Sequence, residues 1–251
     1  MIGVPNFGTF AIPLLYSGLN EQLRLIARAE HCSIDDLLDW VKMFVGTYEM
    51  LPFIGHHPDA PRLCDPKTYG ALCPPQDRFD QAINLQRRLV NDLLSLPFDK
   101  LTYIAGFDQP TACRVKDWSN LHDANSYEYT LEGDGNIAHM LGLIPRVTTY
   151  YARHRHEWLP AKQDVIQAVE DILSTGRTTA LPNDRPAIRR KPQIELVREV
   201  ESNMKEVQRE FALLSQIALN QEGLGILQFT VEQSHLKRLL YSGHPSALIA
   251  R

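Results

Sequence analysis

Short runs of strand-forming residues alternate with segments of helical periodicity, and this order constrains the fold more than any other feature of the chain. Residues 101–107 and 146–152 are the clearest strands, and the second has the highest β-propensity because it contains two threonines and two tyrosines. Apolar residues recur at helical intervals over 79–94 and 165–173, and Pro97 and Gly176 terminate these helices. Strands that alternate with helices predict an α/β fold with a parallel sheet.

Weaker signals extend this pattern towards the N-terminus and through the middle of the chain. Residues 2–4 are apolar and precede a Pro5-Asn6 turn, which predicts a short buried strand, and further strands are expected at 112–115 and 127–131. Helical segments are expected up to about residue 48, followed by a loop over 52–76. We expect residues 2–4, 101–105 and 146–152 to form adjacent parallel strands with one unprotected edge, which favours strand pairing or aggregation.

The composition changes after Leu181. Residues 182–192 are polar and contain prolines, as expected of a linker, and a helix with an apolar seam follows. The seam alternates steps of three and four residues over about three heptads: Val197, Val200, Met204, Val207, Phe211, Leu214 and Ala218. Such a helix needs an apolar partner. Either residues 193–219 bind another chain, or the helix packs against its own domain. We therefore divide the chain into a main domain (1–181), a linker (182–192) and a helical extension (193–251).

Composition excludes some functions. The formal net charge of -4 provides no basic surface for nucleic acid. The chain contains neither a signal peptide nor an apolar run of membrane-spanning length, so the chain as given is expected to be cytoplasmic, although an authentic N-terminus could lie upstream. The four cysteines form no C-x-x-C pair and are expected to be free thiols, with a Cys64–Cys73 bridge as the alternative.

The candidate chemistry lies in Gly133-Asp134-Gly135 and in the two histidines that follow the strand at 146–152. The flanking glycines allow a sharp turn that aims the carboxylate of Asp134 along the carboxyl edge of a sheet, although a G-D-G tripeptide alone is usually an ordinary turn. A carboxylate on one nitrogen of a histidine allows the other nitrogen to act as a general base. The spacing does not choose between His154 and His156.

No metal or cofactor is expected. His154 and His156 lack a nearby third ligand, so they do not predict a zinc site. The other histidines are expected at the surface or in loops, with no evident catalytic partner: His31, His56, His57, His122, His139, His235 and His244.

Several motifs together resemble the lecithin:cholesterol acyltransferase-like family of α/β-hydrolases, and they occur in family order from residue 2 to about residue 190. Residues 2–9 (I-G-V-P-N-F-G-T) are similar to the family segment L-G-T-P-N-x-G-S, and residues 46–52 to P-G-x-Y-x-L-L-P. Residues 65–69 resemble its aspartate-containing loop, and 103–106 with Thr111 its strand ending in G-x-G-x-x-T. Residues 132–137 (E-G-D-G-N-I) resemble the family's G-D-G-T-V, and 156–159 (H-E-W-L) its H-x-x-L.

The resemblance implies the C-terminal part of an α/β-hydrolase, with a helical lid-like insertion, that cleaves or transfers the acyl ester of a lipid. It assigns Asp134 as the triad acid and His156 as the triad base. The departures are Asn136 in place of threonine and Ala138-His139 where proline is expected, which alter the turn but keep the carboxylate.

The sequence contains no serine in a G-x-S-x-G turn. We therefore expect an upstream segment to supply the serine and the oxyanion hole, and this chain alone to be inactive. The alternatives are a non-catalytic interaction protein, with a degenerate hydrolase fold and a partner-binding C-terminal helix, and a truncated remnant that does not fold stably.

Overall fold

The computed structural model contains a small parallel sheet around the strand that ends at Gly106. It describes residues 1–203 and 205, except for 21, 22, 25, 28–31, 73, 94 and 189. Strand β1 (Thr102–Gly106) pairs in parallel with β4 (Thr148–Ala152), in a register that places Gly106 opposite Ala152. On the other side of β1, Ile2 forms a parallel bridge with Ile104. The expected adjacency of the three parallel segments is confirmed, but residues 2–4 contribute a single bridge and not a strand, and β1 lies in the middle.

A second pair of strands differs from the expected parallel sheet. Strand β2 (Thr111–Val115) and strand β3 (Tyr127–Thr130) are antiparallel and form a separate two-stranded sheet, with an irregularity between Ala112 and Arg114. The segment 116–126 that joins them contains only the short 3₁₀ helix η3 (Ala124–Ser126). This connection is too short for the helical crossover that parallel neighbours require, so the chain returns as a hairpin.

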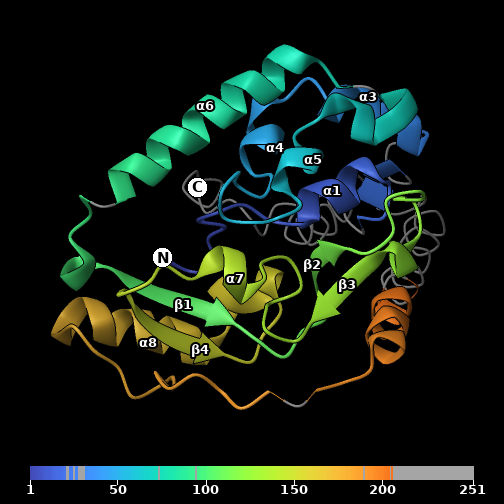
Figure 1. Cartoon of the computed structure of the whole chain (residues 1–251). Helices are drawn as coiled ribbons and strands as arrows, with labels where there is room; N and C mark the ends of the chain where they lie inside the picture. Colours follow the sequence, from blue (N-terminus) through green and yellow to red (C-terminus); the bar gives the residue numbers. More distant parts are fainter. Residues whose placement is uncertain are drawn as a thin grey trace, which may run out of the picture.

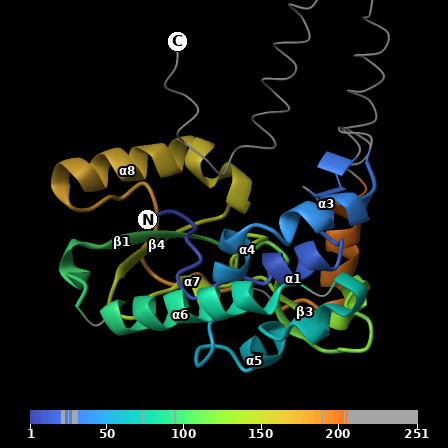
Figure 2. The same cartoon turned by 90° about the horizontal axis from the view of Figure 1, so that it is seen from above.

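Helices cover both faces of the parallel sheet. Figures 1 and 2 show α8 (Gln163–Thr175) on one side of β1 and β4, and α6 (Gln76–Leu93) with α7 (His139–Gly142) on the other. Side chains of β1 alternate between these faces, as expected of a pleated strand. Ile104 packs in the cluster with α8, whereas Tyr103 and Ala105 belong to the larger core. The strands and helices therefore form the layers of an α/β fold.

Most of the remaining elements come between the N-terminal segment and α6 in the sequence. The region 52–76, expected to be a loop, contains two short helices, because local backbone hydrogen bonds such as Cys64 N to Ala60 O (2.9 Å) close single turns there. The further elements are α1 (Ala11–Tyr16), α3 (Ile34–Val41), α4 (Val45–Glu49), α5 (Ala60–Leu63), η1 (Pro66–Leu72), η2 (Phe98–Lys100) and η4 (His156–Ala161). Cys32, Cys64 and Cys113 are free thiols, so the alternative Cys64–Cys73 bridge is wrong.

Most strand edges are covered by side chains or loops. The ring of His57 is hydrogen-bonded to the carbonyl of Cys113 in β2. The side chain of Gln193 is hydrogen-bonded to both the N–H and the C=O of Tyr129 in β3. The backbone N–H of Tyr151 in β4 donates to the carbonyl of Pro182. By contrast, within the part of the chain that the structure describes, the N–H and C=O of Ile2 form no hydrogen bond on the side away from β1. Among the described residues, this is the edge whose backbone groups lack partners, as expected of an unprotected edge.

The extension begins by packing against the main domain. Residues 193–203 are helical, and Leu196 and Val197 are buried in the larger core. The described start of the extension therefore uses its own domain as an apolar partner. The later seam residues lie outside the described residues: Met204, Val207, Phe211, Leu214 and Ala218. Among the residues that are described, no helix is both long and apolar enough to cross a membrane.

Candidate active site

Asp134 lies in a tight turn after β3, and close packing of glycines fixes the position of this turn. A Cβ on Gly106, at the end of β1, would lie 2.4 Å from the Cβ of Asp134 and 2.8 Å from the carbonyl oxygen of His154. A Cβ on Gly133 would lie 2.5 Å from Oγ1 of Thr111. Only glycine therefore fits at these two positions, and the absence of side chains lets the turn approach the carboxyl end of β1 closely.

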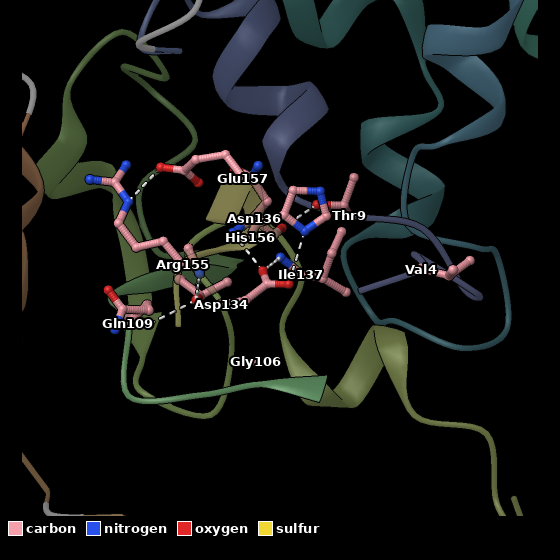
Figure 3. Close-up of polar contacts among 12 residues, drawn as sticks. Val4, Thr9, Gly106, Gln109, Asp134, Asn136, Ile137, Arg155, His156 and Glu157 are labelled. Carbon is pink, nitrogen blue, oxygen red and sulfur yellow. Dashed lines mark hydrogen bonds and ion pairs between the residues drawn. The ribbon is translucent and has the colours of Figure 1, made fainter. Parts of the chain in front are cut away.

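The carboxylate of Asp134 is buried and fully hydrogen-bonded. Its side chain is only 2% exposed. Oδ1 accepts hydrogen bonds from the backbone N–H groups of Asn136 (3.0 Å) and Ile137 (2.6 Å), and Oδ2 accepts one from Nδ1 of His156 at 2.9 Å. Figure 3 shows these groups gathered around Asp134. The backbone bonds orient the carboxylate, so that Oδ2 is directed at the imidazole.

His156 is held at both its backbone and its ring. The chain turns after β4, and the N–H of His156 donates to the carbonyl of Asp134 at 2.8 Å. The carboxylate bond at Nδ1 fixes the tautomer, so that the neutral ring carries its proton on Nδ1 and its lone pair on Nε2. Among the residues that the structure describes, none is hydrogen-bonded to Nε2, and the side chain is 29% exposed. A reacting group can therefore reach the nitrogen opposite Asp134.

The electrostatics of the pair favour a charged imidazole. Burial alone lowers the pKa of His156, but the hydrogen bond to Asp134 and the negative charges of Asp134 and Glu157 outweigh it. The pKa of His156 is consequently raised above its ordinary value of 6.5. A carboxylate that stabilises an imidazolium in this way assists proton transfer to the ring.

His154 points away from Asp134 and has a carboxylate of its own. Its Nε2 lies 3.0 and 2.9 Å from the two carboxylate oxygens of Asp164, in the first turn of α8. The turn after Ala152 thus directs the two rings to different carboxylates, His154 to Asp164 and His156 to Asp134, as the assignment of His156 as the base requires. The geometric expectation that Asp134 and His156 lie within hydrogen-bond distance is confirmed.

Three further residues support the site: Thr9 and Thr111, which lie in the family-like motifs, and His139, which has no distinct signal in the sequence. Thr111 is fully buried, and its hydroxyl accepts the N–H of Gly135 at 2.8 Å. Thr9 donates to the carbonyl of Asn136 at 2.5 Å, which ties the start of α1 to the Asp134 turn. His139 is buried, contrary to the expectation of a surface position, and its Nε2–H donates to the carbonyl of Gly106 at 2.8 Å. The family-like motifs draw attention to both threonines but do not indicate which groups their hydroxyls contact.

The N-terminal segment passes directly beside the acid and the base. A Cβ on Gly3 would lie 3.1 Å from Nδ1 of His156 and 3.2 Å from Oδ2 of Asp134, and the φ of Gly3 is +53°. The open sheet edge at Ile2 therefore adjoins the pair. A strand added in parallel at this edge would end at the same end of the sheet, because parallel strands share their carboxyl edge.

Within the described residues, no group of three or more histidine, cysteine, aspartate or glutamate side chains could hold a metal ion. Comparisons with protein-family models, curated proteins and solved structures found no match to this chain.

Proposed function

We propose that this chain is the C-terminal part of a serine-dependent α/β-hydrolase of the lecithin:cholesterol acyltransferase type, which hydrolyses or transfers the acyl group of a lipid ester. The single observation that carries the proposal is the 2.9 Å contact between a buried, backbone-oriented carboxylate and Nδ1 of His156, with no described residue bonded to Nε2. The resemblance of residues 2–190 to that family supplies the substrate class.

In the proposed reaction, neutral His156 accepts the proton of a serine hydroxyl at Nε2. Asp134 keeps the second proton on Nδ1 and stabilises the imidazolium that forms. The imidazolium then returns its proton to the departing alkoxide of the ester. Because the pKa of His156 is raised, the base is active only above that pKa, and activity is expected to fall as the pH drops through it.

The serine is proposed to come from a segment outside these 251 residues. The sequence has no G-x-S-x-G motif, and the open edge at Ile2 adjoins the pair. A strand on that edge, followed by a turn, would bring its last residue towards Nε2 of His156. The alternative, a non-catalytic protein that binds a partner through residues 193–219, is less favoured because Leu196 and Val197 are already buried in the core of the chain itself.

The test compares the chain with an N-terminally extended form that adds a strand and a G-x-S-x-G turn before Met1. The extended protein should hydrolyse short-chain esters and react covalently with a fluorophosphonate, whereas residues 1–251 alone should do neither. His156→Ala should remove most of the activity of the extended form, and His122→Ala, which lies in the β2–β3 connection, should leave it intact. Strong esterase activity of residues 1–251 that survives His156→Ala would refute the proposal.

A further inference from the structure

A second histidine–aspartate pair lies beside the candidate active site and is not used by the proposed reaction. His154 and Asp164 are ten positions apart in the sequence and meet through Nε2 and both carboxylate oxygens. The segment between them contains η4, which begins at His156, and Leu159, which is 1% exposed. The pair therefore closes the loop that carries the proposed base.

The backbone of His154 also contacts the other half of the site. Its carbonyl oxygen lies 2.8 Å from the position of a Cβ on Gly106, and the same position lies 2.4 Å from the Cβ of Asp134. Two residues later, the N–H of His156 donates to the carbonyl of Asp134. A displacement of His154 from α8 would therefore move a backbone segment that packs directly against the turn holding the carboxylate.

Asp164 is anchored on a rigid element. It lies in the first turn of α8, where a negative charge interacts favourably with the positive end of the helix dipole. Val165 and Ala168 of α8 are buried in the cluster that also contains Ile104 and Leu159. The carboxylate is thus fixed relative to the sheet, whereas the turn at 153–155 has no regular secondary structure of its own.

We propose that His154 and Asp164 form a positioning clamp, which holds the turn after β4 against α8 and thereby keeps the imidazole of His156 on Asp134. His154 is a positioning residue and does not contact the reacting atoms. The clamp gives the proposed catalytic pair a fixed geometry in the absence of substrate. This inference adds a role to the function proposed above, but it concerns the geometry of His156 and is measured without turnover.

The experiment uses nuclear magnetic resonance of the full chain with labelled histidines. In the unaltered protein, the Nδ1–H of His156 should give a downfield signal protected from exchange, and the pKa of the ring should be raised. His154→Ala should lower that pKa and speed exchange of the Nδ1–H about tenfold, as expected from the loss of one charge-assisted hydrogen bond. His154→Gln, which keeps a donor near the position of Nε2, should restore both properties.

Asp164→Asn supplies a second variant, and Asp171→Asn is its matched control because it removes the same charge from α8. The carboxylate of Asp171 instead accepts hydrogen bonds from Gln167 and Thr178. We expect Asp164→Asn to alter the His156 signals and Asp171→Asn to leave them unchanged. The clamp would be disproved if folded His154→Ala kept the pKa and the exchange rate of His156, or if both aspartate variants changed them equally. Because no ester is turned over, failure of the serine proposal would not affect this result.

Discussion

Replacement of Asp134 by asparagine separates the electrostatic role of the carboxylate from its structural role. Asparagine has nearly the same shape, so its oxygen can still accept the N–H groups of Asn136 and Ile137. Its amide nitrogen then faces Nδ1 of His156 and donates instead of accepting, which forces the proton of the neutral ring onto Nε2. The nitrogen proposed to accept a proton from serine would be blocked.

The size of the effect follows from the distance between the charge centres of the carboxylate and the imidazolium. A unit charge pair separated by about 4 Å interacts by on the order of 4 kcal/mol at an effective dielectric constant of ~20. Asp134→Asn removes this attraction but leaves the burial of the ring, which by itself lowers the pKa of His156. We therefore expect the pKa of His156 to fall from above its ordinary value to below it. The free energy of unfolding at neutral pH should decrease by much less in Asp134→Asn than in Asp134→Ala, which also removes the acceptor of the two backbone N–H groups.

Asp134→Ala serves as the comparison. It leaves two backbone N–H groups without their acceptor beneath a residue that is 1% exposed. The cost of each buried unpaired group is about 1–3 kcal/mol, and in a chain of this length each kcal/mol lowers the Tm by roughly 2–4 °C.

Histidine titration by nuclear magnetic resonance and thermal unfolding measure the two quantities separately. If the raised pKa of His156 persisted in Asp134→Asn, the carboxylate would not be its cause and the argument would fail. Equal stability of the alanine and asparagine variants would show that the backbone bonds contribute nothing.

Two further predictions use the same pair. Because the folded-state pKa of His156 is raised, the stabilisation that its charged form provides is fully present below the ordinary value of 6.5 and is lost as the pH rises through the folded-state pKa. Thermal unfolding should therefore show that His156→Asn lowers the Tm more at pH 6 than at pH 9. A difference in Tm that stays constant with pH would contradict the linkage. Gly3→Ala should destabilise the fold by about 1–3 kcal/mol from backbone strain and should also lower the pKa of His156, because its Cβ would lie 3.1 Å from Nδ1. Gly70→Ala is the matched control, since Gly70 has a φ of +54° with no atom within 4 Å of its Cβ, and it should show the strain without the change in His156.

The strands of the parallel sheet were accessible to sequence reasoning because their signals are local. The threonines and tyrosines of 148–151 and the apolar run before Gly106 mark strands without reference to the rest of the chain. The antiparallel pairing of β2 with β3 was not foreseen, because strand direction depends on the path of the connecting segment. The short helices in 52–76 were missed because proline-rich segments can still close single helical turns when tertiary contacts hold them.

The candidate site shows the same division. The glycines around Asp134 predict a turn that presents a carboxylate, and the spacing limits its partner to one of two histidines, of which the family-like motif at 156–159 selects His156. Residues that hold the turn from a distance, such as Thr111 and His139, could not be found in this way. Their hydrogen bonds to Gly135 and Gly106 span 24 and 33 positions of the sequence.

The amino-acid sequence by itself determined which segments form the parallel strands and placed a carboxylate and two imidazoles after them, because strand propensity and turn chemistry act between near neighbours. The spacing of the two histidines left the choice between them open, and the tertiary structure places His156 on Asp134. That choice depends on the turn after Ala152, which is fixed by contacts with Gly106 on one side and Asp164 on the other. Both partners come from other elements of the fold, so spacing along the chain could not separate the two histidines, and the assignment of His156 came only from the resemblance of residues 156–159 to a family motif.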